Sequence, residues 1–345
     1  MRIFIGILFV LFATVSNAST DRTDFAELYE KHINSVVTIY TANISNKGGS
    51  KKVQKGVGSG VLVEDNQIIT AAHVVDGASI IEVLFNDGKR IKADVVTSLK
   101  ASDIALIKLK RAHPTAPPAV LADSNETRIG SEVFIIGSPF GISQTLSVGH
   151  LSGRMNRGLM VGGTPIEFLQ TDTAINTGNS GGPMFNTEGE VIGIVSFILT
   201  KSGGFEGIGF ATSSNTAKEA LLTSSGVLAG FEGIMLDERT ASALNFPGPG
   251  LLVQRVVADS VIGEAGLSAG TIPAQIGEQS LLLGGDLILE INGLVCATPH
   301  DFQLVKASTL ALSEEDSYSI KVFRNGEIVE LFAGTPLGSS IVNSH

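Results

Sequence analysis

The sequence predicts a mainly β protein with two domains, on three grounds. Short runs rich in β-branched residues recur along the chain between turn sequences such as NDG at 86–88 and NTEG at 186–189. The composition holds 40 glycines and no tryptophan, which fits a turn-rich protein better than a helical bundle. A length of 345 residues favours two domains, and a hydrophobic fraction of 43% provides for a sizeable core.

The N-terminal segment predicts export. Arg2 precedes an apolar run over 3–15, and Ser16 and Ala18 supply the small residues that a signal peptidase recognises. The run is short for a membrane span and suits a signal peptide. We therefore predict a signal peptide over 1–18. The alternative is that the segment is not cleaved and stays as a membrane anchor.

The first domain is expected over 19–226. It opens with an amphipathic helix over 23–33 and closes with a helix over 214–223. The dense strand-like runs between them favour antiparallel barrels or a sandwich. These runs are VVTIYT, GSGVLV, QIITAA, IEVLF, IKADVV, IALIKL, EVFIIG, QTLSVG, IEFLQT, EVIGIVSFIL and GIGFAT.

A second, smaller domain is expected over 228–337. Helices are predicted near 260–267 and 299–309, and the segment 270–285 interrupts the pattern. The predicted strands are GIML, LLVQRV, DLILEI, YSIKVF and EIVELF.

Composition excludes several classes of function. The net charge is −10 and no cluster of basic residues interleaves with aromatics, so we expect no nucleic-acid partner. Cys296 is the only cysteine, which rules out an internal disulfide, and its apolar surroundings indicate a core residue. No metal-ligand spacing and no phosphate-binding loop occur, so we expect neither a metal nor another cofactor.

Three residues far apart in the sequence form a candidate catalytic set. Ser180 lies in TGNSGGP, a stretch flexible enough to aim backbone N–H groups at one point. His73 lies in ITAAHVVD, where small neighbours leave room to face a cleft, and Asp103 heads the apolar run of ASDIALIKL. A serine needs such a base, and the base needs an orienting carboxylate. His150 competes for the role of base. Asp76 and Asp172 compete for the role of the acid. Asp76 suits a turn cap, and Asp172 suits a structural role.

The order His73, Asp103, Ser180 is that of chymotrypsin-like barrels. With TDTAINTGNSGGP at 171–183 and GIGFA at 207–211, the chain resembles the HtrA/Deg serine proteases over nearly all its mature length. The resemblance implies a chymotrypsin-like double β-barrel followed by one PDZ domain. It also implies that Ser180 is the nucleophile, His73 the base and Asp103 its orienting acid.

The resemblance implies further site residues. The oxyanion hole falls at Gly178, Asn179 and Ser180, with the amides of Gly178 and Ser180 converging. Ser196 and Phe197 lie where the family pairs with substrate backbone. Ala174 stands where trypsin-like enzymes carry an acid, and the opposite wall of the pocket is expected at Ile208, Gly209 and Phe210. We therefore predict cleavage after small or medium aliphatic residues.

In the second domain, Phe231, Glu232, Gly233 and Ile234 lie where the family has its carboxylate-binding loop, which grips C-terminal peptides. Glu232 is unusual there, because it would repel a carboxylate. GGDLILEING at 284–293 matches the family's core strand, whereas 270–285 inserts residues and puts the groove geometry in doubt.

Regulation and assembly are inferred from the same resemblance. Arg154 matches the family's sensor arginine, with an ordinary solvated arginine as the alternative. The loop at 42–56 is short for a cage-forming relative, so we expect a homotrimer held partly by Phe25 and Tyr29.

The predicted function is that of a periplasmic, ATP-independent serine endopeptidase acting on misfolded or unfolded proteins, with PDZ recognition of apolar C-termini. Two alternatives stay open. One is a regulatory protease with a dedicated membrane-protein substrate, and the other is a chaperone or peptide-binding protein in which proteolysis is secondary.

Overall fold

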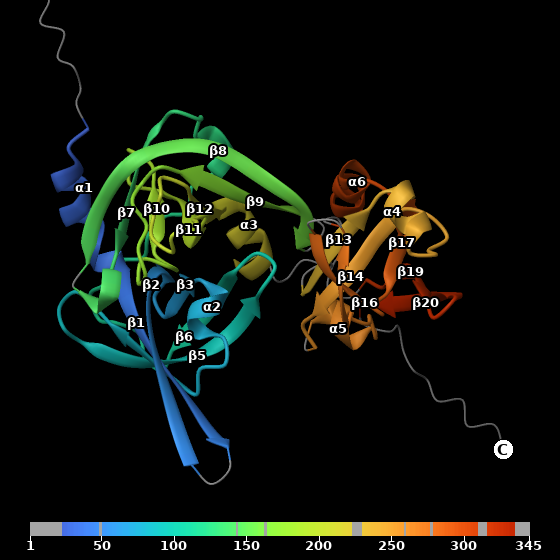
Figure 1. Cartoon of the computed structure of the whole chain (residues 1–345), viewed down its shortest axis with the longest axis horizontal. Helices are drawn as coiled ribbons and strands as arrows, with labels where there is room; N and C mark the ends of the chain where they lie inside the picture. The colour runs from blue at the N-terminus through green and yellow to red at the C-terminus, as the bar shows by residue number, and fades with distance from the viewer. Residues whose placement is uncertain are drawn as a thin grey trace, which may run out of the picture.

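The computed structural model describes residues 23–47, 50–142, 144–161, 164–222, 230–258, 260–276, 279–309 and 316–334. The predicted signal peptide over 1–18 and the predicted domain boundary near 226–228 lie outside these ranges. Figure 1 shows two bodies, the larger built from the residues up to 222 and the smaller from those after 230. Among the described residues, no helix combines the length and apolar character needed to cross a membrane.

The strands of the first part of the chain are β1 (Val36–Lys47), β2 (Ser50–Glu64), β3 (Gln67–Thr70), β4 (Ile80–Leu84), β5 (Arg90–Leu99), β6 (Ile104–Leu109), β7 (Glu132–Gly137), β8 (Thr145–Val161), β9 (Thr164–Thr171), β10 (Pro183–Phe185), β11 (Val191–Ile198) and β12 (Gly209–Ser213). Its helical segments are α1 (Phe25–His32), η1 (Ile33–Ser35), α2 (Ala72–Val75), η2 (Ser124–Glu126), η3 (Pro139–Gly141), α3 (Ser214–Ala217) and the π-helical η4 (Lys218–Leu222).

These strands make two antiparallel barrels, which confirms the predicted double-barrel fold. The first closes in the order β1-β2-β3-β6-β5-β4. The second closes because β7 pairs with both β8 and β10, and the ring continues through β9, β12 and β11. Side chains along a barrel strand point alternately inward and outward. The inward-pointing ones fill both interiors and are buried and mainly aliphatic.

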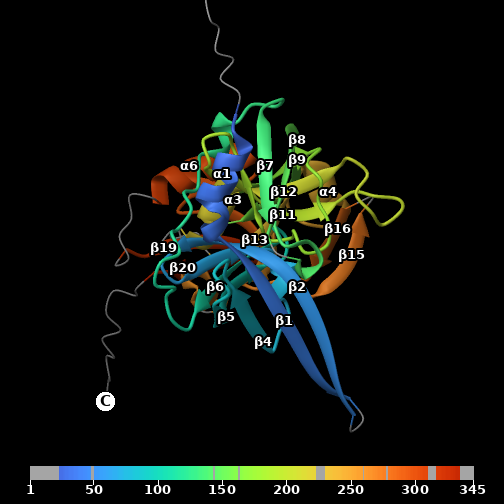
Figure 2. The same ribbon diagram turned by 90° about the vertical axis from the view of Figure 1, so that its left-hand side faces the viewer.

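The segment 42–56, expected to be a short loop, is instead the outer part of a long hairpin. The pairing of β1 with β2 continues without a break from Val36↔Val61 to Lys47↔Ser50. The hairpin extends well beyond the barrel in Figures 1 and 2. The sequence of this part is polar and lacks a hydrophobic alternation, so its strand character could not be recognised.

Helix α1 precedes the first barrel in sequence but packs against the second barrel. The ring of Phe25 meets the ring of Phe134 edge to face at 5.9 Å between centroids. The hydroxyl of Tyr29 donates to the Gln144 carbonyl at 2.8 Å. Both half-buried side chains therefore help to hold α1 on the second barrel, and their part in a trimer contact stays a prediction.

The second part of the chain contains strands β13 (Phe231–Leu236), β14 (Gly250–Val256), β15 (Ile272–Ile276), β16 (Gln279–Leu283), β17 (Leu287–Ile291), β18 (Leu294–Val295), β19 (Tyr318–Arg324) and β20 (Glu327–Ala333). Its helices are α4 (Glu238–Ala243), α5 (Val261–Glu264) and α6 (Pro299–Thr309).

The core of this second domain lies between its sheet and α6, and Cys296 is buried in it as expected. The segment 270–285 contributes the hairpin β15–β16. The side chain of Gln254 on β14 holds this hairpin by bonding to the backbone N–H and C=O of Leu282. The insertion therefore adds a wall beside the sheet and leaves the core strands in place.

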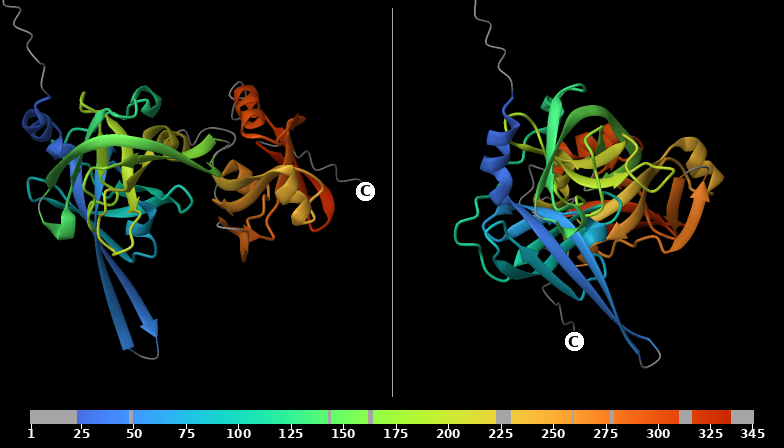
Figure 3. Two further views of the ribbon diagram at one scale, coloured as in Figure 1. Left: turned by 45° about the horizontal axis from the view of Figure 1, so that its top comes forward. Right: turned by 60° about the vertical axis from the view of Figure 1, so that its left-hand side comes forward.

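A backbone pairing joins the two domains. β8 runs out of the second barrel and its end pairs antiparallel with β13, with Val161 opposite Glu232 and Leu159 opposite Ile234. Figures 1 and 3 show β8 arching from the barrel to the second domain. One sheet thus passes from the second barrel through β8 into β13, β14, β17, β19 and β20.

Candidate active site

His73 and Asp103 meet at the edge of the first barrel. His73 lies on the short helix α2, which follows β3, and Asp103 precedes β6, the strand paired with β3. The Nδ1 atom of His73 lies 3.0 and 2.9 Å from the two carboxylate oxygens of Asp103. The backbone N–H of His73 also donates to Oδ1 at 3.1 Å. These contacts fix both the position and the tautomer of the imidazole.

Asp103 has a left-handed backbone, with φ at 50°. This conformation is uncommon for residues other than glycine and turns the carboxylate from the strand toward His73. The hydroxyl of Ser196 donates to Oδ2, so both carboxylate oxygens accept hydrogen bonds. From the sequence, Ser196 is expected only to bind substrate, because no local pattern links it to a carboxylate 93 positions away.

The pKa of His73 is raised above its ordinary value. The main cause is the hydrogen bond to Asp103, whose negative charge also favours the imidazolium, while burial acts in the opposite direction. The pair can therefore stabilise a proton taken up by His73.

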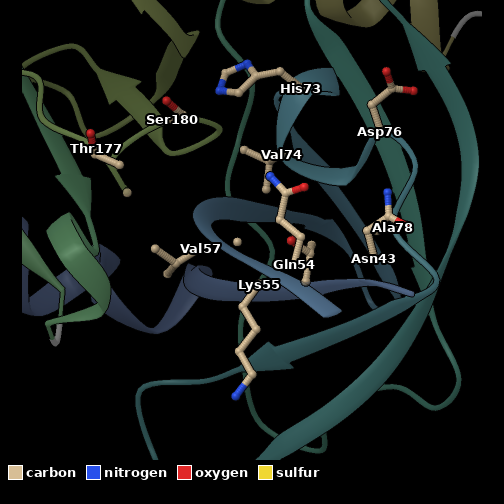
Figure 4. Close-up of a pocket in the computed structure, with 13 residues that line it drawn as sticks. Asn43, Gln54, Lys55, Val57, His73, Val74, Asp76, Ala78, Thr177 and Ser180 are labelled. Atoms are coloured by element: carbon tan, nitrogen blue, oxygen red, sulfur yellow. The ribbon is translucent and has the colours of Figure 1, made fainter. Parts of the chain in front are cut away.

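Ser180 reaches the same site from the second barrel. Its carbonyl accepts from Ser59 of β2 at 2.8 Å, which anchors the loop between the barrels. His73 and Ser180 line one cavity of about 290 Å³ together with residues of the β1–β2 hairpin, and Figure 4 shows their side chains at the same end of it. The Ser180 hydroxyl donates to the Ser196 carbonyl at 3.4 Å, and in the described part of the chain no hydrogen bond joins it to His73.

The loop before Ser180 depends on glycine. Gly178 has φ of +105°, and a Cβ there would lie 2.3 Å from the Ser138 carbonyl oxygen. Within the described residues, the amides of Gly178 and Ser180 donate to no protein acceptor. The amide of Asn179 donates to the Asn176 carbonyl at 2.9 Å. Contrary to the expectation, Asn179 therefore does not offer its amide to an oxyanion.

The residues predicted to shape the substrate pocket lie in different environments, some exposed or along strands and others buried. Ala174 is exposed, and Ser196, Phe197 and Gly209 lie along the paired strands β11 and β12. Phe210 is 5% exposed and stacks on Phe197 at 4.8 Å between ring centroids. Phe210 thus belongs to a buried cluster that joins residues of both barrels, with the half-buried Ile208 packed against it. Neither belongs to the cavity beside Ser180.

Arg154 on β8 is fully engaged within the chain, contrary to the solvated alternative. Its guanidinium donates to both carboxylate oxygens of Glu167 at 2.9 Å and to the carbonyls of Ser124 and Thr127 at 2.5 and 2.8 Å. Such a bidentate arrangement fixes the side chain. Arg154 therefore ties β8 to β9 and to the loop at η2.

The competing candidates have other partners, although Asp76 also lines the cavity that holds His73 and Ser180. His150 is exposed on β8, where Asp172 accepts from its backbone N–H at 2.6 Å and lies 3.5 Å from its Nδ1. Asp76 forms an ion pair with Lys100 instead of capping a turn. Neither alternative therefore displaces the pair of His73 and Asp103.

The predicted carboxylate-binding residues are placed differently from the expectation. Phe231 is buried in the core of the second domain, and Glu232, Gly233 and Ile234 lie on β13, paired with β8. The carboxylate of Glu232 is buried and accepts hydrogen bonds from the Ala101–Ser102 loop of the first barrel. It therefore does not face a peptide groove, and the expected repulsion of a peptide carboxylate is wrong for this arrangement.

Comparisons with known proteins agree with this geometry. A family model described as a trypsin-like peptidase domain matches residues 58–194, which include His73, Asp103 and Ser180. A probable DegP-like periplasmic serine endoprotease of Marinomonas is 34% identical over 359 residues, covering 92% of this chain and 72% of that protein. The chain belongs to the HtrA/Deg family of serine proteases.

Other HtrA/Deg relatives are longer than this chain. The periplasmic serine endoprotease DegP of Salmonella typhimurium is 34% identical over 292 residues, covering 82% of this chain and 57% of that protein. A probable DegP-like protein of Halomonas elongata is 34% identical over 287 residues, covering 81% and 56%. The chain spans little more than half the length of these two relatives.

Solved HtrA/Deg structures share the fold over most of the chain. The HtrA-type protease AlgW with a tripeptide is 28% identical with a TM-score of 0.55, covering 90% of this chain and 96% of that one. The same protease with a decapeptide is 26% identical with a TM-score of 0.56, covering 90% and 98%.

Proposed function

We propose that this HtrA/Deg protein is a periplasmic, ATP-independent serine endopeptidase that cleaves misfolded or unfolded proteins. The observation that carries the proposal is the pairing of His73 with Asp103 beside Ser180, with two unused backbone amides at Gly178 and Ser180. The relatives named as periplasmic serine endoproteases support both the activity and the location.

The geometry supports an acyl-transfer mechanism. The Ser180 hydroxyl leaves the Ser196 carbonyl, turns to Nε2 of His73 and attacks the scissile carbonyl carbon as its proton passes to His73. The carbonyl oxygen takes the negative charge and binds the amides of Gly178 and Ser180. Collapse of this intermediate breaks the C–N bond, and His73 returns the proton to the leaving amine. Water then attacks the acyl group by the same route and releases the acid.

Substrate preference belongs to the same proposal. Position 174 holds an alanine where a basic substrate residue would require an acid, so the side chain before the cut is small or medium and aliphatic. At Ser196 and Phe197, β11 pairs with β12 on one side and extends past the end of β10 on the other. This second side pairs with the substrate backbone, which suits extended, unfolded polypeptides. Assembly into a homotrimer is part of the proposal, and light scattering during size-exclusion chromatography tests it.

We further infer that the second domain is a PDZ domain that binds apolar C-terminal peptides. Strand β13 is the edge to which such a peptide would add, and α6 and the core residues around Phe231 flank it. The HtrA-type protease AlgW, a structural neighbour, has been solved with a tripeptide and with a decapeptide. Because the end of β8 occupies this edge here, a peptide must displace residues 159–161 in order to bind.

The decisive experiment compares the purified protein with its Ser180→Ala variant on casein. Loss of the nucleophile is expected to lower cleavage by roughly 10⁴-fold or more. Ser152→Ala, an exposed serine on β8, is the matched control and is expected to keep full activity. Equal activity of the wild type and Ser180→Ala would refute the endopeptidase. If neither protein cleaves and both suppress aggregation equally, the chaperone alternative is favoured.

A further inference from the structure

Glu232 is a fully buried carboxylate that belongs to one domain and bonds to the other. It lies on β13 of the second domain and is 0% exposed. Its two oxygens lie 3.1 and 3.3 Å from the amide nitrogen of Ala101 in the first barrel. Oε1 also accepts from the amide and the hydroxyl of Ser102, each at 3.4 Å.

The loop that Glu232 binds leads directly into Asp103. Besides Glu232, the hydroxyl of Thr212 on β12 holds this loop by donating to the Ser102 carbonyl at 2.5 Å. Asp103 follows Ser102 in its left-handed conformation. Such a backbone persists only where its surroundings impose it, so the contacts at 101–102 help to set the direction of the Asp103 side chain.

Because Glu232 is buried, its carboxylate depends on the hydrogen bonds from Ala101 and Ser102. Burial raises the pKa of its carboxyl group, while the amides of Ala101 and Ser102 and the charge of Arg255 act in the opposite direction. The guanidinium of Arg255 lies 3.7 Å away. A carboxylate is rarely buried unless its oxygens are bonded, and removing it would leave two inward-facing amides without an acceptor.

We propose that Glu232 of the second domain is a positioning residue for the catalytic acid. By holding the amides of Ala101 and Ser102, it keeps Asp103 aimed at His73. This inference rests on the triad of the proposed function. It means that docking of the second domain completes the alignment of the base, although no atom of that domain touches the substrate's reacting bond.

The test measures steady-state cleavage of a fluorogenic casein by the full-length protein and its Glu232→Ala and Glu232→Met variants. Both remove the acceptor oxygens, and the methionine preserves the volume should the alanine variant fail to fold. We expect kcat to fall about 10- to 100-fold with KM changed less than twofold, because misalignment affects the reacting groups and not substrate binding. Glu232→Gln, which keeps an acceptor oxygen, is expected to restore most of kcat.

A second readout separates positioning from general damage. A looser contact between Asp103 and His73 lowers the pKa of His73, so the acidic limb of the kcat/KM profile moves to lower pH in Glu232→Met. Glu290→Gln is the matched control, because it breaks a 2.6 Å ion pair with Lys321 inside the second domain without touching the 101–102 loop. Circular dichroism and thermal melting verify folding.

The outcomes distinguish this inference from the proposed function. If Ser180→Ala abolishes cleavage while Glu232→Met keeps the wild-type kcat and pH profile, the positioning role is refuted and the triad stands. An increased kcat, or a loss matched by Glu290→Gln, would also refute it. If Ser180→Ala remains active, the proposed function itself fails.

Discussion

Asp103 gives His73 both its orientation and its capacity to hold a proton. The carboxylate bonds to the ring Nδ1 and to the backbone amide of the same residue. Ser196 bonds to it from the second barrel, so the acid is held from both barrels. The bond from Ser196 could be recognised only from the structure, because Ser196 lies 93 positions from Asp103 in the sequence.

The raised pKa of His73 makes a prediction about pH. His73 acts as a base only when neutral, and its folded pKa lies above 6.5, so kcat/KM is expected to rise with pH through a midpoint above 6.5. Asp103→Asn removes the main cause of the shift and disfavours the required tautomer. It is expected to move the midpoint to lower pH and to reduce kcat by about 10⁴-fold. Rate profiles from pH 5 to 9 provide the measurement.

Asp172→Asn is the control for this pH experiment, because Asp172 lies beside the exposed His150 and outside the triad. It should leave the profile unchanged. A shift of the midpoint in Asp172→Asn, with none in Asp103→Asn, would assign the base to His150 instead of His73.

At the scale of elements, the end of β8 occupies the strand edge of the second domain. Met160 is 1% exposed and lies in the core cluster of that domain with Phe231, Phe302 and Val305. Leu159 packs on the other face of the sheet, against the cluster around Ile234. The hairpin of β8 and β9 therefore occupies the position that we propose for a peptide, in the same antiparallel direction.

This arrangement predicts competition between the hairpin and peptides. Met160→Ala removes the buried side chain and weakens the docked hairpin, which increases the fraction of molecules with a free edge. We expect the Kd of a decapeptide copying residues 152–161, SGRMNRGLMV, to fall about tenfold. Fluorescence anisotropy with the labelled peptide measures this change.

Met155→Ala is the matched control for the hairpin. Met155 lies on the same strand but packs against the barrel, opposite Phe168. Its truncation should leave the peptide Kd within twofold of the wild type. Equal Kd values for Met160→Ala and the wild type would show that the hairpin and the peptide do not share the edge.

At the scale of the whole molecule, two kinds of contact hold the domains together. The backbone pairing of β8 with β13 makes one continuous sheet, and Glu232 bonds across to the loop before Asp103. Lys100 and Ala101 also line a cavity of about 570 Å³ with the β15–β16 hairpin. The relative position of the domains is therefore part of the active-site geometry.

Hydrogen exchange should report this connection directly. In the full chain, the backbone of 159–161 and of 232–234 is expected to be protected, because the two segments pair. Saturation with the decapeptide should speed exchange at those amides of 159–161 that bond to β13, while the pairing of β8 with β9 is kept, and should leave 232–234 protected by the new strand. Mass spectrometry of peptic fragments measures both segments, and continued protection of 159–161 would contradict displacement.

The sequence by itself determined most of the secondary structure and the choice of candidate catalytic residues. Buried strands such as β6 and helices such as α6 follow from local hydrophobic patterns, and the predicted bounds 104–109 and 299–309 match them. His73, Asp103 and Ser180 could be proposed because nucleophilic catalysis requires their chemistry in a recognised order. The short helix α4 and the hairpin β15–β16 lacked a pattern long enough to predict.

Tertiary structure alone decided how these parts act on one another. The position of β8 on β13, the burial of Phe210 and the contact of Glu232 with the Asp103 loop depend on pairing between residues distant in the sequence. A polar residue such as Glu232 has the same local pattern whether it faces a peptide or a neighbouring domain. Only the packing of the two domains selects its partner, because a buried carboxylate is stable only where amides meet it.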